Sequence, residues 1–157
     1  TVNLFKKYDI NAYFTGCLTL FFDDVIEKTG GKYLVDVNTK CDYIPNIDFD
    51  ISKYNDYQII EHDIKVNISL KERLNIAEQL LNKYKNAELV ITTRLHCILP
   101  CRAFNTNSIF IHKKYINDPR FSGLKNIING DTKIHTNSQG DRDDIEQIRN
   151  NFVLLKI

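Results

Sequence analysis

The densest group of chemically useful side chains is the run Thr92-Thr93-Arg94-Leu95-His96. Thr92 and Thr93 can cap a helix that begins near Arg94, and the amino end of a helix attracts anions through free N–H groups and its dipole. The planar guanidinium of Arg94 can hold a carboxylate or phosphate, and the imidazole of His96 can hold or release a proton near neutral pH. The run therefore predicts a site for a phosphorylated, carboxylated small molecule or a nucleotide-sugar. A structural alternative stays open, in which Arg94 pairs with a carboxylate and His96 caps a turn.

Short apolar runs alternate with longer amphipathic segments around this run. The short runs are rich in Val, Ile, Tyr and Phe, which is typical of strands, and lie at residues 12–14, 33–37, 57–61, 89–92, 109–111 and 133–135. The clearest helix spans 70–84, where Ser69 and Glu72 form a capping box ahead of an apolar stripe. Further helices are expected at 18–29, at 95–104 with Pro100 bending or breaking it, at 119–128, and from Asp141 or Asp143 to about residue 154.

This alternation predicts a fold class. Repeated strand–helix–strand units build a parallel sheet with helices on both faces, so we expect a Rossmann-like, three-layer α/β domain with a mostly parallel six-stranded sheet. Ligands of such sheets bind beyond the carboxyl ends of the strands. Besides the run at 92–96, polar residues follow three other expected strands, at Thr15-Gly16-Cys17, His62-Asp63 and His112-Lys113-Lys114-Tyr115.

Two of these strand ends supply further binding candidates. Thr15, Gly16 and Cys17 are expected to line the site, with the glycine allowing a ligand to approach the backbone closely. Lys114 is the cationic candidate after the fifth expected strand. His62 is a weaker candidate for the site than these residues.

Composition excludes several classes of function. The chain has 157 residues, with 21 Lys and Arg against 20 Asp and Glu, so it has no basic excess for a nucleic acid or an anionic membrane. No apolar run reaches the roughly 18 residues of a membrane-spanning helix. P-loop, GxGxxG and nucleophile-elbow motifs are absent, which leaves ATPase or kinase chemistry without support.

The cysteines do not predict a metal site. Cys97 and Cys101 lie four apart beside His96, but zinc needs about four suitably spaced ligands and the chain has no CxxC pair. We expect them to be small apolar side chains on one helix face. Reduced thiols indicate a cytoplasmic or cytosol-like compartment, or a Golgi lumen if an amino-terminal anchor has been removed.

Three blocks of the sequence, in order, resemble the polysaccharide pyruvyl transferase family. The first is Tyr13-Phe14-Thr15-Gly16-Cys17-Leu18-Thr19-Leu20. The second runs from Glu88 through Arg94-Leu95-His96 to Pro100, Ala103-Phe104 and the strand at 108–111, and the third is Asp118-Pro119-Arg120-Phe121 with Gly123-Leu124. This chain departs from the family pattern in having Cys97 after the histidine and Asn105-Thr106-Asn107 before the next strand.

The resemblance implies a function and a division of roles. It implies transfer of a pyruvyl group from phosphoenolpyruvate to glycan hydroxyls to form a ketal, with no cofactor or metal. Arg94 would bind the donor's carboxylate or phosphate, with Thr93 and the Leu95 backbone assisting, and His96 would protonate the enol carbon. It also implies that residues 1–157 form one domain, the carboxyl-terminal half of a two-domain GT-B-like enzyme whose missing amino-terminal half binds the acceptor. A nucleotide-sugar glycosyltransferase and a non-catalytic glycan-related module remain as alternatives.

Overall fold

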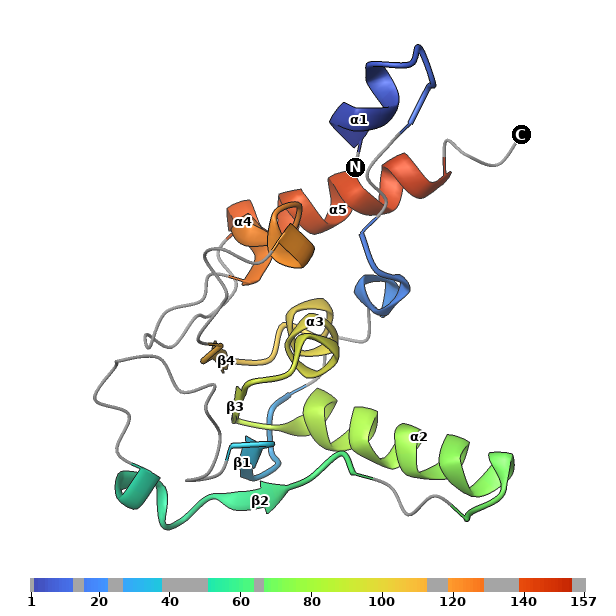
Figure 1. Ribbon diagram of the computed structural model, residues 1–157. Helices are drawn as coiled ribbons and strands as arrows, with labels where there is room; N and C mark the ends of the chain where they lie inside the picture. Colours follow the sequence, from blue (N-terminus) through green and yellow to red (C-terminus); the bar gives the residue numbers. More distant parts are fainter. Residues whose placement is uncertain are drawn as a thin grey trace.

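The computed structural model describes residues 2–12, 16–22, 27–37, 51–63, 67–112, 119–128 and 139–153. Its centre is a parallel sheet with the strand order β2-β1-β3-β4 (Figure 1). The strands are β1 (Lys32–Val35), β2 (Gln58–Ile60), β3 (Leu89–Thr92) and β4 (Ser108–Phe110). The α-helices are α1 (Val2–Lys6), α2 (Leu70–Asn86), α3 (Leu95–Ala103), α4 (Lys125–Ile128) and α5 (Gln139–Val153), and the 3-10 helices are η1 (Leu18–Phe21), η2 (Ile51–Tyr54) and η3 (Pro119–Phe121).

The parallel α/β fold is confirmed, but the expectation of six strands is wrong for the residues that the structure describes. Four of the expected strands are present. Ala12 belongs to no strand, while residues 13–14 and the run at 133–135 lie outside the described ranges. A short apolar run specifies a strand only if a neighbouring strand takes up its backbone hydrogen bonds, and such runs do not encode that partner.

The two faces of the sheet are covered differently. The consecutive crossovers β2–α2–β3 and β3–α3–β4 advance in the same direction, so the right-handed rule puts both helices on one face (Figure 1). There Tyr33, Val35, Ile60 and Val90 of the sheet pack with Tyr84 of α2 and with Cys97 and Cys101 of α3. The opposite side chains of the same strands, such as Leu34 and Ile91, pack with Tyr54 and Tyr57 at η2. Within the described ranges the second face therefore meets a 3-10 turn and not the expected α-helix.

Helix α3 lies at the centre of the molecule, and it is buried beyond its first two residues. Every residue from Cys97 to Ala103 is buried. Ile98 and Leu99 pack into a second cluster, which also contains Leu20 of η1, Ile127 and Ile128 of α4, and Ile145 and Ile148 of α5. Pro100 lies inside the helix without ending it, contrary to the break considered from the sequence. Cys97 and Cys101 are buried core side chains, as expected.

The carboxyl end of α3 is closed by an asparagine in the left-handed conformation. Asn105 has φ 54°, its N–H donates to the carbonyl of Arg102 (3.1 Å), and the Thr106 N–H donates to the carbonyl of Cys101 (2.8 Å). This pair of hydrogen bonds is the Schellman motif, in which glycine is the usual residue and asparagine an occasional one. Asn105 thus supplies the positive φ that glycine usually supplies in this motif.

Of three other expected helices, two are confirmed and one is replaced by shorter elements. Helix α2 is confirmed with its capping box, since the Glu72 N–H donates to Ser69 Oγ and the Ser69 N–H to the Glu72 carboxylate. The last helix is also confirmed, beginning at Gln139. The segment 119–128 forms only the short elements η3 and α4.

The continuous helix expected at 18–29 is wrong: in the described part of this segment Leu18–Phe21 form the 3-10 helix η1, Phe22 is extended, and residues 27–29 are irregular. Tertiary contacts explain this result. Arg149 of α5 donates from Nε to the Leu20 carbonyl and from Nη2 to the Phe22 carbonyl, so it occupies acceptors that a continuing helix would use. The Phe22 ring also stacks on Phe104, with centroids 5.2 Å apart.

Candidate functional site

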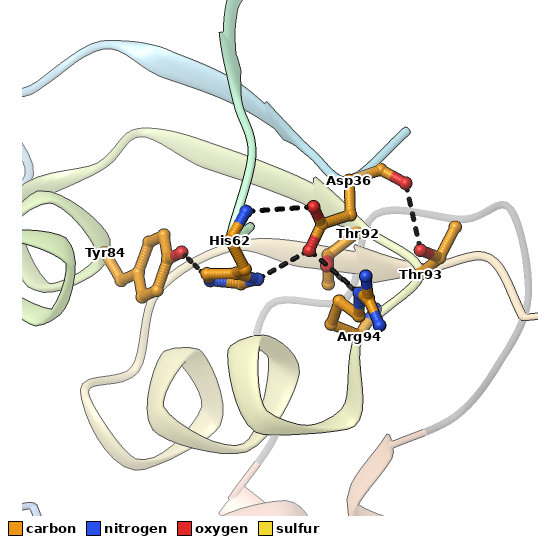
Figure 2. A network of polar contacts seen from close by, with 6 residues as sticks. All are labelled: Asp36, His62, Tyr84, Thr92, Thr93 and Arg94. Carbon is orange, nitrogen blue, oxygen red and sulfur yellow. Dashed lines mark hydrogen bonds and ion pairs between the residues drawn. The ribbon is translucent and has the colours of Figure 1, made fainter. Parts of the chain in front are cut away.

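The carboxyl ends of three neighbouring strands place polar side chains side by side. Asp36 follows β1, His62 lies two residues beyond β2, and Arg94 lies two residues beyond β3 (Figure 2). Parallel strands bring their carboxyl ends to the same edge of a sheet, which is the edge where ligands of α/β folds bind. We therefore treat this edge as the candidate site.

Asp36 is the centre of the group. Its carboxylate Oδ1 accepts from the His62 backbone N–H (3.0 Å), and Oδ2 lies 2.6 Å from His62 Nδ1 and 2.9 Å from Arg94 Nε. Burial raises the pKa of the Asp36 carboxyl, but the His62 N–H, the His62 ring and the Arg94 charge outweigh burial and hold that pKa below its ordinary value. Asp36 is therefore a carboxylate at neutral pH.

His62 and Tyr84 extend the group into the core. His62 Nε2 lies 2.6 Å from the hydroxyl of Tyr84, a residue of α2 whose side chain is buried (Figure 2). Burial raises the pKa of the Tyr84 phenol, so the phenol stays protonated and can donate to Nε2. The neutral tautomer of His62 with its proton on Nδ1 then satisfies both contacts, because Nδ1–H donates to Asp36.

The two threonines do not cap α3, contrary to the expectation from the sequence. The N-cap residue is Arg94, and no side chain caps the helix. Thr92 Oγ1 accepts from the Arg94 backbone N–H (3.0 Å), and Thr93 Oγ1 donates to the Asp36 carbonyl (3.1 Å). Both threonines are buried, so they fix the turn between β3 and α3 and hold it against Asp36. Thr93 thus offers no exposed hydroxyl to a ligand.

Arg94 combines a structural contact with an exposed fork. It pairs with a carboxylate, as the structural alternative foresaw, but only through Nε. Its side chain is 54% exposed, and neither terminal Nη group has a hydrogen-bond partner among the residues that the structure describes. These two groups form the edge of a guanidinium that binds carboxylates and phosphates bidentately.

Leu95 and His96 occupy the first turn of α3. Leu95 is half-buried against the cluster around Ile98, so its side chain is structural. His96 is exposed, and it makes no hydrogen bond or ion pair with any other described residue. The N–H groups of Leu95 and His96 lie before the first intrahelical donor, Cys97, whose N–H reaches the Arg94 carbonyl. The helix end thus presents free donors beside the Arg94 guanidinium.

The ligand-binding role of Gly16 stays a prediction, while the structure gives this glycine a packing role. Gly16 has φ 64°, and a Cβ built there would lie 2.9 Å from Ile148 Cγ2 and 3.2 Å from Leu20 Cδ1. The close approach is therefore made by α5. Cys17 is half-buried against the same cluster and accepts a hydrogen bond from Thr19 Oγ1 (3.2 Å). Thr15 and Lys114, the other two candidates, lie outside the described residues.

Sequence reasoning missed Asp36 and undervalued His62. The strand at 33–37 was expected to include Asp36, whereas β1 ends at Val35 and Asp36 takes a left-handed backbone, with φ 52°. An acidic residue at the carboxyl end of an apolar strand was the signal available. His112 also lies two residues beyond a strand, β4, but its ring packs on Phe110 and Phe121.

Two further absences apply to the described ranges. They contain no group of three His, Cys, Asp or Glu side chains that could hold a metal ion. Their helices are too short or too polar for any to cross a membrane.

The fold and the site together define a class of protein. A parallel α/β domain with a guanidinium and free helix N–H groups at the carboxyl edge is typical of proteins that bind small anionic molecules. The sequence model of the polysaccharide pyruvyl transferase family matches residues 1–112, which include the whole sheet, Asp36, Arg94 and His96. The chain belongs to this family of transferases. No curated protein and no solved structure matches it.

Proposed function

We propose that the protein transfers a pyruvyl group from phosphoenolpyruvate to a glycan and forms a ketal. The observation that supports this best is the exposed Nη edge of Arg94 next to the free N–H groups of Leu95 and His96. Such a set of donors suits a small molecule that carries both a carboxylate and a phosphate. Family membership makes phosphoenolpyruvate the donor of choice, since it carries both groups.

In the proposed reaction His96 is the general acid. It protonates the methylene carbon of the enol, which becomes the methyl group, while one sugar hydroxyl adds to the neighbouring carbon. The C–O bond to phosphate then breaks, and a second hydroxyl adds to close the ketal. Of the two hydroxyl protons, one restores His96 and one leaves with the phosphate, so atoms and charges balance. An exposed imidazole in the first turn of α3 can exchange protons with solvent between turnovers.

Arg94 and the helix end stabilise charge in this scheme. The guanidinium and the Leu95 N–H bind the donor's carboxylate or phosphate, and the same groups stabilise the departing phosphate. Thr93 contributes by fixing the turn that carries Arg94. No cofactor or metal is needed for these steps. We further propose that this domain of residues 1–157 works with a second, GT-B-like domain that provides acceptor contacts, in a reducing compartment.

The test is a donor comparison on the full-length protein. Saturable binding of phosphoenolpyruvate, with phosphate release and a ketal product in the presence of glycan acceptors, would support the proposal. His96→Gln should keep donor binding and lower turnover by about 10²–10⁴-fold, the usual contribution of a general acid. Lys83→Ala, at an exposed position of α2, is the control and should behave as wild type. Saturable binding of UDP-sugars without binding of phosphoenolpyruvate would reject the proposal, and full biological activity of the Arg94→Ala and His96→Ala variants would favour a non-catalytic module.

A further inference from the structure

Hydrogen bonds to both its backbone and its side chain hold Asp36 in place. Its N–H donates to the Ile60 carbonyl (2.9 Å), its carbonyl accepts from Thr93, and both carboxylate oxygens accept hydrogen bonds. Its side chain is only 9% exposed. The backbone lies in the left-handed region, which non-glycine residues adopt at a cost and aspartate tolerates better than most. Such over-determined, strained positions cluster at functional sites.

The contact between Asp36 and Arg94 has an informative geometry. Asp36 takes the Nε–H, which lies on the side of the guanidinium nearest the main chain. A hydrogen bond at Nε fixes the plane of the group and leaves the outer edge, formed by the two Nη groups, without a hydrogen bond to Asp36 (Figure 2). A surface arginine without this contact would sample many rotamers, and ordering a long side chain on binding costs affinity.

The remaining members of the group hold the carboxylate itself. His62 contacts both oxygens of Asp36, one through its backbone N–H and one through its ring, and Tyr84 fixes the far side of that ring. The chain of contacts therefore runs from the buried phenol of α2 to the exposed guanidinium at the start of α3 (Figure 2). Each member restrains the next one.

We propose that Asp36 is a positioning residue for donor binding, which holds the guanidinium of Arg94 in its binding orientation and is itself held by His62 and Tyr84. This inference rests on the proposed function, because it assigns the Arg94 fork to the donor.

Removing the charge of Asp36 should change donor affinity in opposite directions under the positioning role and under a purely electrostatic effect. A carboxylate beside the site repels an anionic donor, so if charge alone mattered, Asp36→Asn would tighten donor binding. Positioning predicts the opposite result. Asparagine also tolerates the left-handed backbone, so the variant should fold. It cannot accept hydrogen bonds with both side-chain atoms, so the contacts to His62 and Arg94 are no longer all satisfied.

A double-mutant cycle with phosphoenolpyruvate as the probe tests this. Dissociation constants are measured for the full-length wild type, Asp36→Asn, Arg94→Ala and the double variant, with circular dichroism confirming the fold. Asp36→Asn should weaken binding by about tenfold, the typical size of one interaction of 1.4 kcal/mol, and should have no weakening effect once Arg94 is absent. Asp56→Asn, which removes an exposed carboxylate paired with Lys32 at the amino edge of the sheet, is the matched control and should bind as wild type.

Either of two results would overturn the proposal: equal or tighter binding by folded Asp36→Asn, or the same weakening in the Arg94→Ala background. If Asp36→Asn does not fold, His62→Gln replaces it in the same cycle and should show a smaller weakening that also depends on Arg94.

A measurement without any donor separates this proposal from the proposed function. In proton–nitrogen spectra, the Nε–H resonance of Arg94 should exchange slowly with water in the wild type and fast in Asp36→Asn. If phosphoenolpyruvate does not bind the wild type, the proposed function fails, and the exchange of this resonance alone then decides whether Asp36 holds Arg94. Fast exchange in the wild type would contradict the positioning role.

Discussion

Arg94 Nε lies 2.9 Å from Asp36 Oδ2, so a charged hydrogen bond joins the residues that follow two neighbouring parallel strands, β1 and β3. The sequence left two interpretations of Arg94 open, an anion ligand or a partner for a carboxylate. The structure shows the carboxylate contact at Nε and an exposed Nη edge on the same side chain. The two interpretations therefore do not exclude each other, because different atoms of one guanidinium serve them.

The Asp36 carboxylate should give the protein an acid-sensitive component of stability. Its folded-state pKa lies below the unfolded value of about 3.9, so its contribution is fully present above that pH and is lost as the pH falls through the folded pKa. Urea denaturation at pH 5 and pH 3 should show a smaller drop in unfolding free energy for Asp36→Asn than for the wild type. Identical drops for the two proteins would contradict the assignment.

Gly16 should matter for stability and not for donor binding. Gly16→Ala combines a positive φ with a Cβ only 2.9 Å from Ile148 Cγ2, so we expect a loss of about 1–3 kcal/mol in unfolding free energy. Gly31→Ala is the control, since its Cβ would meet only ordinary contacts of 3.5 Å or more, and should change stability by less than about 1 kcal/mol. A folded Gly16→Ala protein that loses donor affinity would contradict this prediction and would indicate that Gly16 lies in the donor site.

The end of α3 offers a test of its left-handed cap. Asn105→Ala should lower the unfolding free energy by about 1 kcal/mol, because alanine is strained at φ 54°, whereas Asn105→Gly should be at least as stable as the wild type. Chemical denaturation of the three proteins gives the order directly. An alanine variant as stable as the glycine variant would mean that this turn does not require a positive φ.

Lys28 joins the carboxyl ends of two helices. Its Nζ donates to the carbonyls of Lys85 at the end of α2 (2.6 Å) and Phe104 after α3 (2.8 Å), where the helix dipoles favour a cation. Lys28→Met should lower the unfolding free energy by about 2 kcal/mol, which is the usual contribution of a hydrogen bond from a charged group. Lys32→Met, which removes an exposed ion pair to Asp56, should cost less than about 1 kcal/mol, and an equal cost for both would contradict the joining role.

Local signals made part of the fold predictable. The capping box at Ser69 and Glu72 is satisfied within one helical turn, so its prediction did not depend on the rest of the molecule. The strand at Leu89–Thr92 is buried along its whole length, and its continuous apolar run indicated this. The exposed positions of Arg94 and His96 were predictable because the residues that follow the carboxyl ends of parallel strands form the ligand-binding edge of the sheet.

Tertiary contacts decided what the sequence did not predict. The helix expected from residue 18 stops after one turn because Arg149, far along the chain, takes its carbonyls. Asp36 was overlooked because its importance lies in contacts to His62 and Arg94, which come from two other strand ends. Gly16 drew attention as a flexible residue near a strand end, but only the packing of Ile148 shows what approaches it.

The most direct test of the account is a calorimetric titration of phosphoenolpyruvate into the full-length wild type and the Arg94→Ala and Arg94→Lys variants. Lysine keeps the charge but lacks the planar fork. We predict a saturable wild-type isotherm, an affinity loss of about 10–100-fold for alanine from the missing charged hydrogen bonds, and a clear loss for lysine as well. Equal affinity in all three proteins would contradict the claim that the guanidinium at the end of β3 binds the donor.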